Sequence, residues 1–552
     1  MTATSTKRFT ITFVIVFLAC FAVVFGGTVK TENESQGLRK NNAEPKDSLI
    51  CQITLVEVQY DRSSTADQSS QHGDFFECTP VQDSELSDLS YRIDLSSIDT
   101  TTDERLLHGE LFVSVYGGRI EGDDVILSKK SVVSVVPPPA GFQSRRHLVA
   151  KTGTLSVLVL RISTNDSTPS LSADEFHKLI FEDEVSLKKQ YSACSFGKLN
   201  LVPTEHGVLD LYLNTTAEGA TPISLVSMAN QALRERLGIA KTTDASDLLL
   251  MIMPPGTGDW AAFSGVGHPR SVYNDLWGGY SSSLLHEVGH GLGLGHANED
   301  GSDYTDYTSY MSAGHKQTNW PAKSFNAQNH WDLGWYEDRS VSVDPIAAPQ
   351  LLKIAAFVDY DKTQPGEHVL AEVGVENLYM QYNRAKGFNR DTEEKADMLT
   401  ISTKMDGGTD LVAGLDLDSN TYLVAGFQGS DQDILIEVCY VGVGNSVDQP
   451  DYMIVSVGVG PSLCGQEYTP QEYTPSIPSP TVSQERDPTE PIPVATDDKP
   501  SSEQNGSGVS TTTLILIILA ILSCLATSVL FVVRRRRASS KLESDFKDAP
   551  AP

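Results

Sequence analysis

The stretch SSSLLHEVGHGLGLGHANEDG, residues 281–301, contains two conflicting signals. His286 and His290 are four residues apart, a spacing that places two side chains on one face of a helix. Glycine nevertheless stands at every second position from Gly289 to Gly295, and each glycine inside a helix costs about 1 kcal/mol relative to alanine. The conflict is resolved if the helix ends within the stretch.

The position of His296 indicates where the helix ends. Lying six residues after His290, it cannot share the face of the first two histidines on a continuing helix, so the chain must turn back. Gly293 can adopt the positive φ of a helix C-terminus. The pattern H-E-x-x-H-x-x-G-x-x-H thus predicts a Zn²⁺ site of three neutral imidazoles, His286, His290 and His296, with a fourth position open for water.

Glu287 follows the first predicted ligand and is not placed to coordinate the same ion. We predict that it is the general base for zinc-bound water, whose pKa the metal lowers towards about 7. It would then pass the proton to the leaving amine of a cleaved peptide. The motif therefore predicts hydrolysis of peptide bonds.

The remaining glycines of the stretch suggest close contacts. We expect Gly295 to let the backbone pass close to the site. Gly289 and Gly291 flank the face that carries His286 and His290, where missing side chains would leave room for substrate or a packed strand. On that hypothesis Gly289→Leu should impair turnover more than zinc binding.

A methionine fifteen residues after His296 strengthens the assignment. The segment TSYMSAG, residues 308–314, places Met311 in a turn. Three such histidines followed by a methionine turn resemble the metzincin proteases. The resemblance implies that Met311 forms the pocket floor without coordinating the metal, whereas a lone methionine would simply be a core residue.

Within the metzincins, the chain resembles the gametolysin family over residues 150–460. The segments that carry this resemblance are YSACSFGKL (191–199), HEVGHGLGLGHA (286–297), DYTSYMSAG (306–314) and FNAQNHWDLGWY (325–336). The first-described members of the family degrade algal cell-wall glycoproteins, which implies a protein or glycoprotein substrate here.

The chain also departs from its relatives. A cysteine often precedes the FNA stretch in the family, where this chain has Ser324, so the resemblance leaves Cys194 without its usual partner. The N-terminal region has no PRCGxPD-like cysteine switch, and no tyrosine stands two residues after Met311. We therefore predict no additional tyrosine ligand, and the sequence offers no mechanism for latency.

Amino-acid composition, and above all net charge, limits the kinds of molecule that we expect the protein to bind. The 552 residues include 72 acidic and 42 basic side chains, a formal charge of −30. Such a charge repels phosphate backbones, so nucleic acid is not an expected partner. The length predicts several domains, and the oligomeric state cannot be inferred.

Two apolar segments predict export and anchoring. Residues 9–25 follow Lys7 and Arg8 and indicate a signal peptide, 1–26, for which an uncleaved anchor is the alternative. Residues 514–533 carry no charge and precede four arginines, which predicts a membrane-spanning helix. The expected protein is a single-pass type I membrane protein, its catalytic ectodomain extracellular or in the secretory-pathway lumen.

The predicted fold class is an α/β (α+β) zincin-type catalytic domain flanked by β-rich domains, with one C-terminal transmembrane helix. The predicted segments are a signal peptide (1–26), a β-rich N-terminal domain and possible prosegment (27–147), the catalytic domain (148–345), a β-rich C-terminal domain, expected to be a sandwich (346–464), a Pro/Ser/Thr-rich stalk (465–510), the transmembrane helix (511–533) and a cytoplasmic tail (534–552). Arg145 and Arg146 are either a processing site or a solvated charge pair.

Cysteines and sequons fit an exported chain. Proximity in sequence predicts the disulfides Cys51–Cys78 and Cys439–Cys464, with Cys194 left over. N-glycosylation sequons occur at Asn33, Asn165, Asn214 and Asn505.

Other features favour less specific interpretations. The acidic residues Glu299, Asp300, Asp303 and Asp306 could bind calcium, but they lack EF-hand spacing and a solvated loop is the better interpretation. We expect His315 and His330 to be surface or hydrogen-bonded residues rather than ligands. No serine-hydrolase elbow, phosphate-binding loop or zinc knuckle is present.

Two alternative functions remain open. One is a catalytically idle surface adhesion or recognition protein that retains a zinc site. The other is a gluzincin whose third ligand is a distant glutamate, which full zinc occupancy in His296→Ala would favour.

Overall fold

A computed structural model gives the structure of the protein. It describes residues 48–60, 75–81, 91–96, 111–138, 149–346, 348–374, 377–405, 407–425 and 433–468. The predicted signal peptide, stalk, transmembrane helix and cytoplasmic tail lie outside these residues. Among the described residues, none of the helices is long and apolar enough to span a bilayer.

The part of the chain that contains the histidine motif is built on five strands. These are β8 (Gly153–Ser163), β9 (Leu199–Tyr212), β10 (Leu248–Met253), β11 (Trp260–Gly265) and β12 (Arg270–Asn274). Their order is β11-β12-β10-β8-β9, and only β11 runs antiparallel to its neighbour. Strand β10, with the sequence LLLMIM, is buried along its whole length, as expected for a strand covered on both faces.

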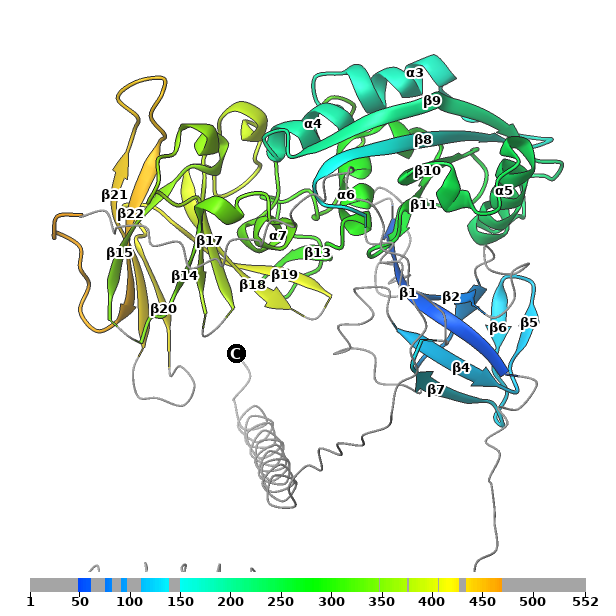
Figure 1. Ribbon diagram of the computed structural model, residues 1–552, viewed down its shortest axis with the longest axis horizontal. Coiled ribbons are helices and arrows are strands. Elements are labelled where there is room, and N and C mark those ends of the chain that lie inside the picture. Colours follow the sequence, from blue (N-terminus) through cyan, green and yellow to red (C-terminus); the bar gives the residue numbers. More distant parts are fainter. Residues whose placement is uncertain are drawn as a thin grey trace, which may run out of the picture. The chain divides into compact units, whose positions relative to one another are not determined.

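Helices cover both faces of these five strands. The α-helices are α3 (Ala173–His177), α4 (Leu187–Cys194), α5 (Pro222–Leu237), α6 (Ser281–Gly291) and α7 (Ala327–Leu333), and the shorter helical turns are η2 (Lys178–Glu182), η3 (Thr242–Asp244), η4 (Asp275–Gly279), η5 (Glu337–Arg339), η6 (Phe357–Lys362) and η7 (Gly387–Asn389). Helices α3 and α4 pack along β9, whereas α6 packs against β11 and β12 (Figure 1).

Successive side chains along the strands point to opposite faces of the sheet, and each face has its own hydrophobic core. Val157 and Val159 of β8 pack in one core with Leu284 of α6. Leu158 of β8 packs in the other core with Leu225 of α5. Helices α6 and α5 therefore lie on opposite faces of the sheet.

In the sequence, Ser172 and Glu175 have capping-box spacing, which predicts a helix running towards Tyr191, but the structure interrupts this helix. The capping box is present, because Ser172 and Glu175 exchange both side-chain to backbone hydrogen bonds. The chain becomes extended at Asp183, and Ser186 then caps a second helix, α4. A second N-cap residue within the predicted helix accounts for the break.

The N-terminal region is β-rich, as predicted, but it is not a separate sheet. Its strands are β1 (Ser48–Tyr60), β2 (Phe75–Pro80), β3 (Tyr91–Ile93), β4 (Phe112–Tyr116), β5 (Arg119–Glu121), β6 (Asp124–Ile126) and β7 (Val132–Val136). The thirteen-residue strand β1 pairs with β2 and β4, and its second half pairs with β11. One twelve-stranded sheet therefore joins both regions (Figure 1).

The C-terminal region contains two sheets, one of which also includes β13 and β14, strands that lie before the predicted boundary at residue 346. The six-stranded sheet contains β13 (His296–Glu299), β14 (Ser340–Val343), β16 (Leu370–Val373), β17 (Leu378–Asn383), β18 (Met398–Met405) and β19 (Gly408–Leu415). The four-stranded sheet contains β15 (Gln350–Ala355), β20 (Thr421–Val424), β21 (Ile434–Gly442) and β22 (Tyr452–Val459). Side chains of both sheets share one core.

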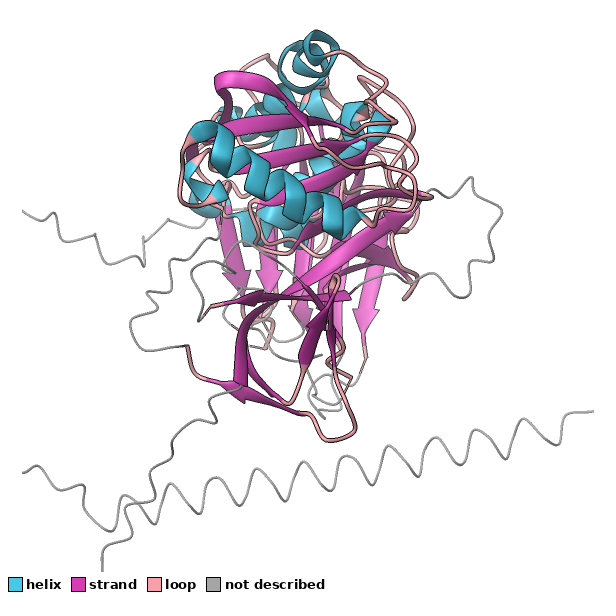
Figure 2. Ribbon diagram, turned by 90° about the vertical axis from the view of Figure 1, so that its right-hand side faces the viewer, coloured by secondary structure: helices cyan, strands magenta, loops and turns pink. Residues whose placement is uncertain are grey.

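The described chain is thus a mixed α+β structure with several sheets and few helices. Figure 2 shows the helices gathered around the upper strands, while the lower part consists of strands and loops. Strand β13, which begins at His296, belongs to the C-terminal sheet through its parallel pairing with β19. The third predicted ligand therefore lies where the two regions join.

Candidate metal centre

Helix α6 carries two of the predicted ligands. All eleven of its residues are buried. Because His286 and His290 are four residues apart, they share one face of the helix, and their Nε2 atoms lie 3.0 Å apart. The helix therefore directs two ring nitrogens towards the same point.

Backbone carbonyls orient these two rings. The Nδ1 atom of His286 lies 2.9 Å from the Tyr310 carbonyl oxygen, and Nδ1 of His290 lies 2.9 Å from that of Leu294. A carbonyl only accepts hydrogen bonds, so each Nδ1 carries the proton and donates it. In a neutral ring this leaves the lone pair on Nε2, the arrangement that metal-binding histidines use.

Glycine terminates the helix after His290. Gly293 has a φ of +89°, and its N–H donates to the His290 carbonyl at 2.8 Å. The N–H of Leu294 then donates to the carbonyl of Gly289 at 3.1 Å. This left-handed turn redirects the chain so that His296 returns towards the first two histidines.

Gly295 permits a close contact with the C-terminal sheet. A Cβ atom at Gly295 would lie 2.1 Å from the carbonyl oxygen of Gly407. In return, a Cβ at Gly408 would lie 2.2 Å from the carbonyl oxygen of His296. The close approach expected at Gly295 is therefore made by the backbone at the start of β19, which pairs with β13.

The three histidines form one buried cluster. Their ligand atoms all lie within 4.8 Å of one another, and the cluster could hold a metal ion. His296 is 7% exposed, and its Nε2 has no hydrogen-bond partner. Burying a polar nitrogen in this state costs free energy unless something binds it. The donor set and this nitrogen both fit a metal ion bound by His286, His290 and His296.

Burial and charge set the protonation of the ligands. Burial, with the neighbouring His290, lowers the pKa of His286 well below its usual value, and burial likewise lowers the pKa of His296. Burial also acts to lower the pKa of His290, but the carboxylates of Glu57 and Glu287 outweigh it and raise the value to about 9. A metal ion therefore competes with a proton mainly at His290.

Glu287 is buried on α6 next to the first histidine. It is 1% exposed, and neither carboxylate oxygen has a hydrogen-bond partner. Burial, together with the charge of Glu57, raises its pKa to about 8, against an opposing effect of His290. The side chain is therefore a buried carboxyl group that can exchange a proton near neutral pH.

Met311 packs under helix α6, and Gly289 provides the space. The methionine is fully buried, and a Cβ at Gly289 would lie 2.4 Å from its Sδ. The preceding residue, Tyr310, supplies the carbonyl that orients His286. The hypothesis that Gly289 leaves room for substrate or a strand is therefore wrong, because the space is filled by Met311.

Gly291 has a different neighbour. A Cβ at this position would lie 3.1 Å from the carbonyl oxygen of His268, in the turn between β11 and β12. The N–H of Gly267 in the same turn donates to the His290 carbonyl at 2.8 Å. Gly291 thus lets this turn approach the helix, so the neighbour is a turn between two strands and not the substrate or packed strand that we expected.

Glu57, a residue of the N-terminal strand β1, also contacts the histidine cluster, and no sequence motif predicted it. Its side chain is 4% exposed, and its Oε2 lies 2.9 Å from Nδ1 of His290 and 3.2 Å from Nε2 of His296. The only available signal was a single acidic residue in the apolar run ICQITLVEVQY. Such a residue does not indicate a contact more than two hundred positions away.

Two tyrosines also lie near the centre. The ring of Tyr304 lies over that of His296, with centroids 3.9 Å apart. The hydroxyl-bearing side chain of Tyr273 is buried, and the Glu287 charge contributes to its raised pKa after burial. Neither residue belongs to a motif, so only the fold reveals it.

The two family segments that have no evident catalytic chemistry, residues 191–199 and 325–336, support the metal centre through hydrogen bonds. Tyr191 donates a hydrogen bond to the carbonyl of Leu285 in α6 at 2.9 Å, and Tyr336 donates to the Cys194 carbonyl at 2.6 Å. Cys194 is a buried free thiol, and the Ser324 side chain forms a hydrogen bond with it. Serine thus occupies the place next to Cys194 that a partner cysteine would need.

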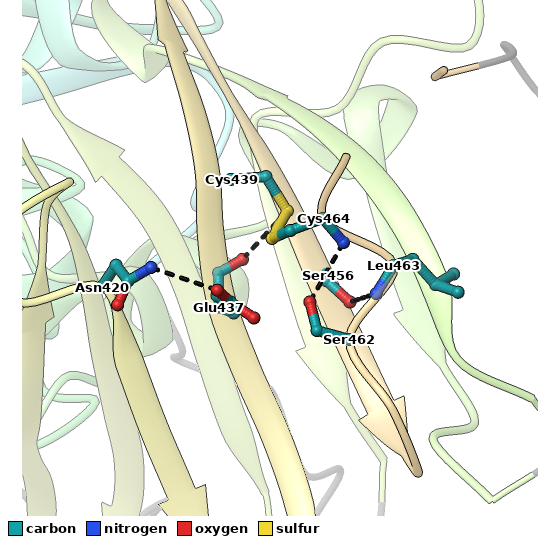
Figure 3. The surroundings of a disulfide bond; sticks show 7 residues. All are labelled: Asn420, Glu437, Cys439, Ser456, Ser462, Leu463 and Cys464. Carbon is teal, nitrogen blue, oxygen red and sulfur yellow. Dashed lines mark hydrogen bonds between the residues drawn. A yellow bond between two sulfur atoms is a disulfide. The ribbon is translucent and has the colours of Figure 1, made fainter. Parts of the chain in front are cut away.

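The expected disulfides join their residues in the structure. Cys51 and Cys78 connect β1 to β2, and Cys439 and Cys464 connect β21 to the segment after β22 (Figure 3). The sequons Asn165 and Asn214 are both exposed. Asn33 and Asn505 lie outside the described residues, as do Arg145 and Arg146.

Part of the predicted acidic loop is buried. Asp306 is 0% exposed and accepts hydrogen bonds from Thr308 and Asn326, whereas Glu299 forms an ion pair with Lys395 at 3.1 Å. The interpretation as a wholly solvated loop is therefore wrong at Asp306, because its hydrogen bonds compensate its burial.

The two other histidines have partners and are not brought to the cluster. His315 forms an ion pair with Glu393 at 2.9 Å. His330 is buried, with Ser324 Oγ 2.9 Å from its Nε2 and Gln381 Oε1 2.7 Å from its Nδ1. Both fit the interpretation of hydrogen-bonded, non-ligand residues.

Three convergent imidazoles beside a buried carboxyl group form a centre typical of metallopeptidases. Residues 154–357 match the family model described as gametolysin peptidase M11. This part of the chain therefore belongs to the gametolysin family of metallopeptidases, which confirms the resemblance over those residues. No curated protein matches the chain.

Proposed function

We propose that the chain is a membrane-anchored, zinc-dependent endopeptidase that hydrolyses peptide bonds in extracellular or cell-wall proteins and glycoproteins. The observation that carries this proposal is the convergence of His286, His290 and His296 beside the buried carboxyl group of Glu287. The family match supports a peptidase, and the geometry of the donors supports the choice of metal.

Zinc suits this donor set. Two ligands of a tetrahedral zinc ion with bonds of about 2.0 to 2.1 Å are about 3.3 Å apart. The Nε2 atoms of His286 and His290 are 3.0 Å apart, close to that value. Zinc held by three neutral imidazoles supplies a Lewis acid that polarises a peptide carbonyl and lowers the pKa of water.

The chain's own residues move the proton. Glu287, whose pKa lies at about 8, accepts a proton from the attacking water and returns it to the amine nitrogen that leaves. A pKa near the working pH suits a group that must both take and give a proton. The carbonyls of Tyr310 and Leu294 keep two ligand rings in the tautomer that coordination requires.

Strand β11 could bind an extended substrate peptide if its pairing with β1 were released. Among the five strands of the peptidase region, β11 is an outermost strand and the only antiparallel one, and helix α6 packs against it. A peptide can add to such an edge through main-chain hydrogen bonds, with its scissile bond beside the histidines. We propose that β11 binds the substrate in this way.

The proposed location rests on three features. The uncharged run 514–533 followed by four arginines supports a single membrane span with the peptidase outside the cytosol. The disulfides Cys51–Cys78 and Cys439–Cys464 fit an oxidising compartment. Exposure of Asn165 and Asn214 fits glycosylation there.

The test uses the full chain and its Glu287→Ala variant. Because Glu57 contacts two ligands, each is prepared with Glu57 intact and as Glu57→Gln. We expect cleavage of a generic unfolded protein in at least the Glu57→Gln background. Glu287→Ala should abolish this cleavage, because the base is lost, while zinc content measured by elemental analysis stays at one ion per chain.

Three results would contradict the proposal. Equal cleavage with Glu287→Ala would exclude Glu287 as the base. No cleavage in either background, with zinc bound, would favour a catalytically idle recognition protein. Full zinc occupancy in His296→Ala would show that His296 is not the third ligand.

A further inference from the structure

Two glycosylation sequons lie side by side in the peptidase region. Asn165 follows β8 in the tripeptide NDS, and Asn214 follows β9 in the tripeptide NTT. The two strands pair in parallel with Ser163 opposite Tyr212, so each asparagine comes two residues after this pair. Because the carboxyl ends of neighbouring parallel strands meet at the same end of a sheet, the two sequons meet there as well.

Hydrogen bonds join the two asparagines and a tyrosine into one chain. The hydroxyl of Tyr212 donates to Oδ1 of Asn165, and Nδ2 of Asn165 donates to Oδ1 of Asn214 at 3.4 Å. The backbone is tied as well, because the N–H of Asn165 donates to the carbonyl of Thr215 at 2.8 Å. Asn214 enters the chain through its carbonyl oxygen, so these bonds do not use its Nδ2, the atom to which a sugar attaches.

Tyr212 presents an aromatic ring to solvent beside Asn214. It is 62% exposed, whereas the intervening Leu213 is 3% exposed, so the chain turns Tyr212 and Asn214 outwards together. The hydrogen bond to Asn165 holds the hydroxyl, and the large exposed fraction leaves apolar ring surface open to solvent. An exposed ring thus lies next to an exposed glycosylation site.

We propose that Asn214 carries an N-linked glycan whose first N-acetylglucosamine packs on the ring of Tyr212. The inference rests on one part of the proposed function, the export of the peptidase region. In the transfer step, a bond forms between Nδ2 of Asn214 and C1 of the sugar. The bond from C1 to a polyprenyl-diphosphate oligosaccharide donor breaks, the diphosphate leaves with the electron pair, and the amide nitrogen loses one proton.

This contact stabilises the end of strand β9. The strand is the last in the order of the twelve-stranded sheet, and Tyr212 is its final residue. One face of an N-acetylglucosamine ring consists mostly of C–H groups, so packing it on the tyrosine ring removes apolar surface of both from water. The amide of Asn165 contacts both other side chains and so keeps the ring close to the attachment point.

The experiment uses the full chain made in a secretory host that adds oligomannose glycans. Mass spectrometry of its glycopeptides shows which asparagines are modified. Thr216→Ala removes the sequon but keeps Asn214 and Tyr212, and Tyr212→Thr removes the ring but keeps a residue that favours strands. The thermal unfolding midpoint is measured for the wild type, both variants and the double variant.

The packing contact predicts that the two substitutions depend on each other. We expect Thr216→Ala to lack the glycan and to unfold about 2 to 4 °C below the wild type. Tyr212→Thr should lower the midpoint by a similar amount in the glycosylated chain, but by less than half as much when combined with Thr216→Ala. The hydrogen bond from Tyr212 to Asn165 is lost equally in both backgrounds, so it does not produce this difference.

Two further measurements serve as controls. Thr215→Ala changes the middle residue of the same sequon, so we expect it to keep both the glycan and the midpoint of the wild type. Endoglycosidase H trims an oligomannose glycan to its first N-acetylglucosamine, which leaves the proposed contact in place. We therefore expect trimming to leave the unfolding midpoint of the wild type unchanged.

The outcomes separate this inference from the proposed function. An equal effect of Tyr212→Thr in both backgrounds, or loss of the stabilisation on trimming, would overturn the packing of the first sugar on the ring. A glycan on another sequon with Asn214 unmodified would overturn this inference alone. A full chain without any glycan, its signal segment still attached, would overturn the proposed export as well, whereas the cleavage test with Glu287→Ala decides the peptidase assignment independently.

Discussion

At the scale of single residues, the glycines of the histidine motif have different structural roles. Gly293 provides a left-handed turn, Gly295 a close contact with β19, Gly289 the space for Met311 and Gly291 the space for the β11–β12 turn. Only the first of these roles requires positive φ. The others depend on neighbours that are distant in the sequence.

The contact between Gly289 and Met311 predicts a cost in stability. Gly289→Ala would bring a methyl group 2.4 Å from the Met311 Sδ, and the buried methionine would have to move. We expect a loss of about 1 to 3 kcal/mol in the free energy of unfolding, measured by urea denaturation. Gly374→Ala is the control, because its Cβ would meet only the Val343 carbonyl oxygen at 3.9 Å. Equal stability of the two variants would contradict the packing role.

The buried His330 predicts a pH dependence of stability. Burial lowers its pKa to about 4, although the hydrogen bond to Gln381 opposes this effect. Below its usual pKa of about 6.5 the unfolded chain binds a proton that the folded chain does not, so stability falls as the pH falls. Between pH 7.5 and 4.5 this residue should contribute a loss of about 2 to 3 kcal/mol.

The measurement compares urea midpoints of the wild type and His330→Gln at the two pH values. The wild type should lose more stability on acidification than the variant. An identical loss in both proteins would show that His330 does not titrate as described.

The sequence was sufficient to predict the three histidines, Gly293 and Met311, because their chemistry follows from local spacing. It could not predict Glu57, because one acidic residue in an apolar strand is compatible with many positions in a fold. The interpretation of Gly289 was wrong for a similar reason. Helical geometry shows which face a residue occupies, but not what packs against it.

At the scale of elements, strand β13 depends on β19. The two pair in parallel, with His296 opposite Gly408. A side chain at Gly408 would collide with the His296 carbonyl, so Gly408→Ala should displace the third ligand. We expect zinc affinity, measured by competition with a chromophoric chelator, to fall about 10- to 100-fold.

Gly414→Ala serves as the control in the same strand. Its nearest atoms belong to the flexible Lys395 side chain, the closest at 2.8 Å, which can move aside. Zinc affinity of this variant should stay near that of the wild type. A comparable loss in both variants would indicate that β19 tolerates no added side chain, and would remove the specific link to His296.

Residue patterns along the chain predict most helices and strands, but they do not predict where a helix is interrupted or which strands pair. The apolar run DLLLMIM (247–253) predicts the buried strand β10, and the pattern of ISLVSMANQALRERLGI (223–239) predicts helix α5. The break between α3 and α4 was not predicted, because helix propensity continues past Asp183 while the second cap at Ser186 starts a new helix. Similarly, nothing in the sequence of β1 shows that its second half pairs with β11.

At the scale of the whole molecule, three sequence regions meet at one centre. The peptidase region provides α6, the N-terminal region places Glu57 against the histidines, and the C-terminal sheet includes β13 with His296. The regions were predicted as successive domains. Changes in amino-acid composition along the chain show where strands and helices are concentrated. They do not show that strands of two regions belong to one sheet.

The pairing of β13 with β19 also has a consequence for synthesis of the protein. The partner strand of β13 leaves the ribosome more than a hundred residues after His296. At about 5 to 20 residues per second, the delay is roughly 5 to 20 seconds. During that interval the nascent chain has its first two metal-binding side chains but lacks the partner that positions the third. We therefore expect tight binding of a metal ion only after translation has passed β19.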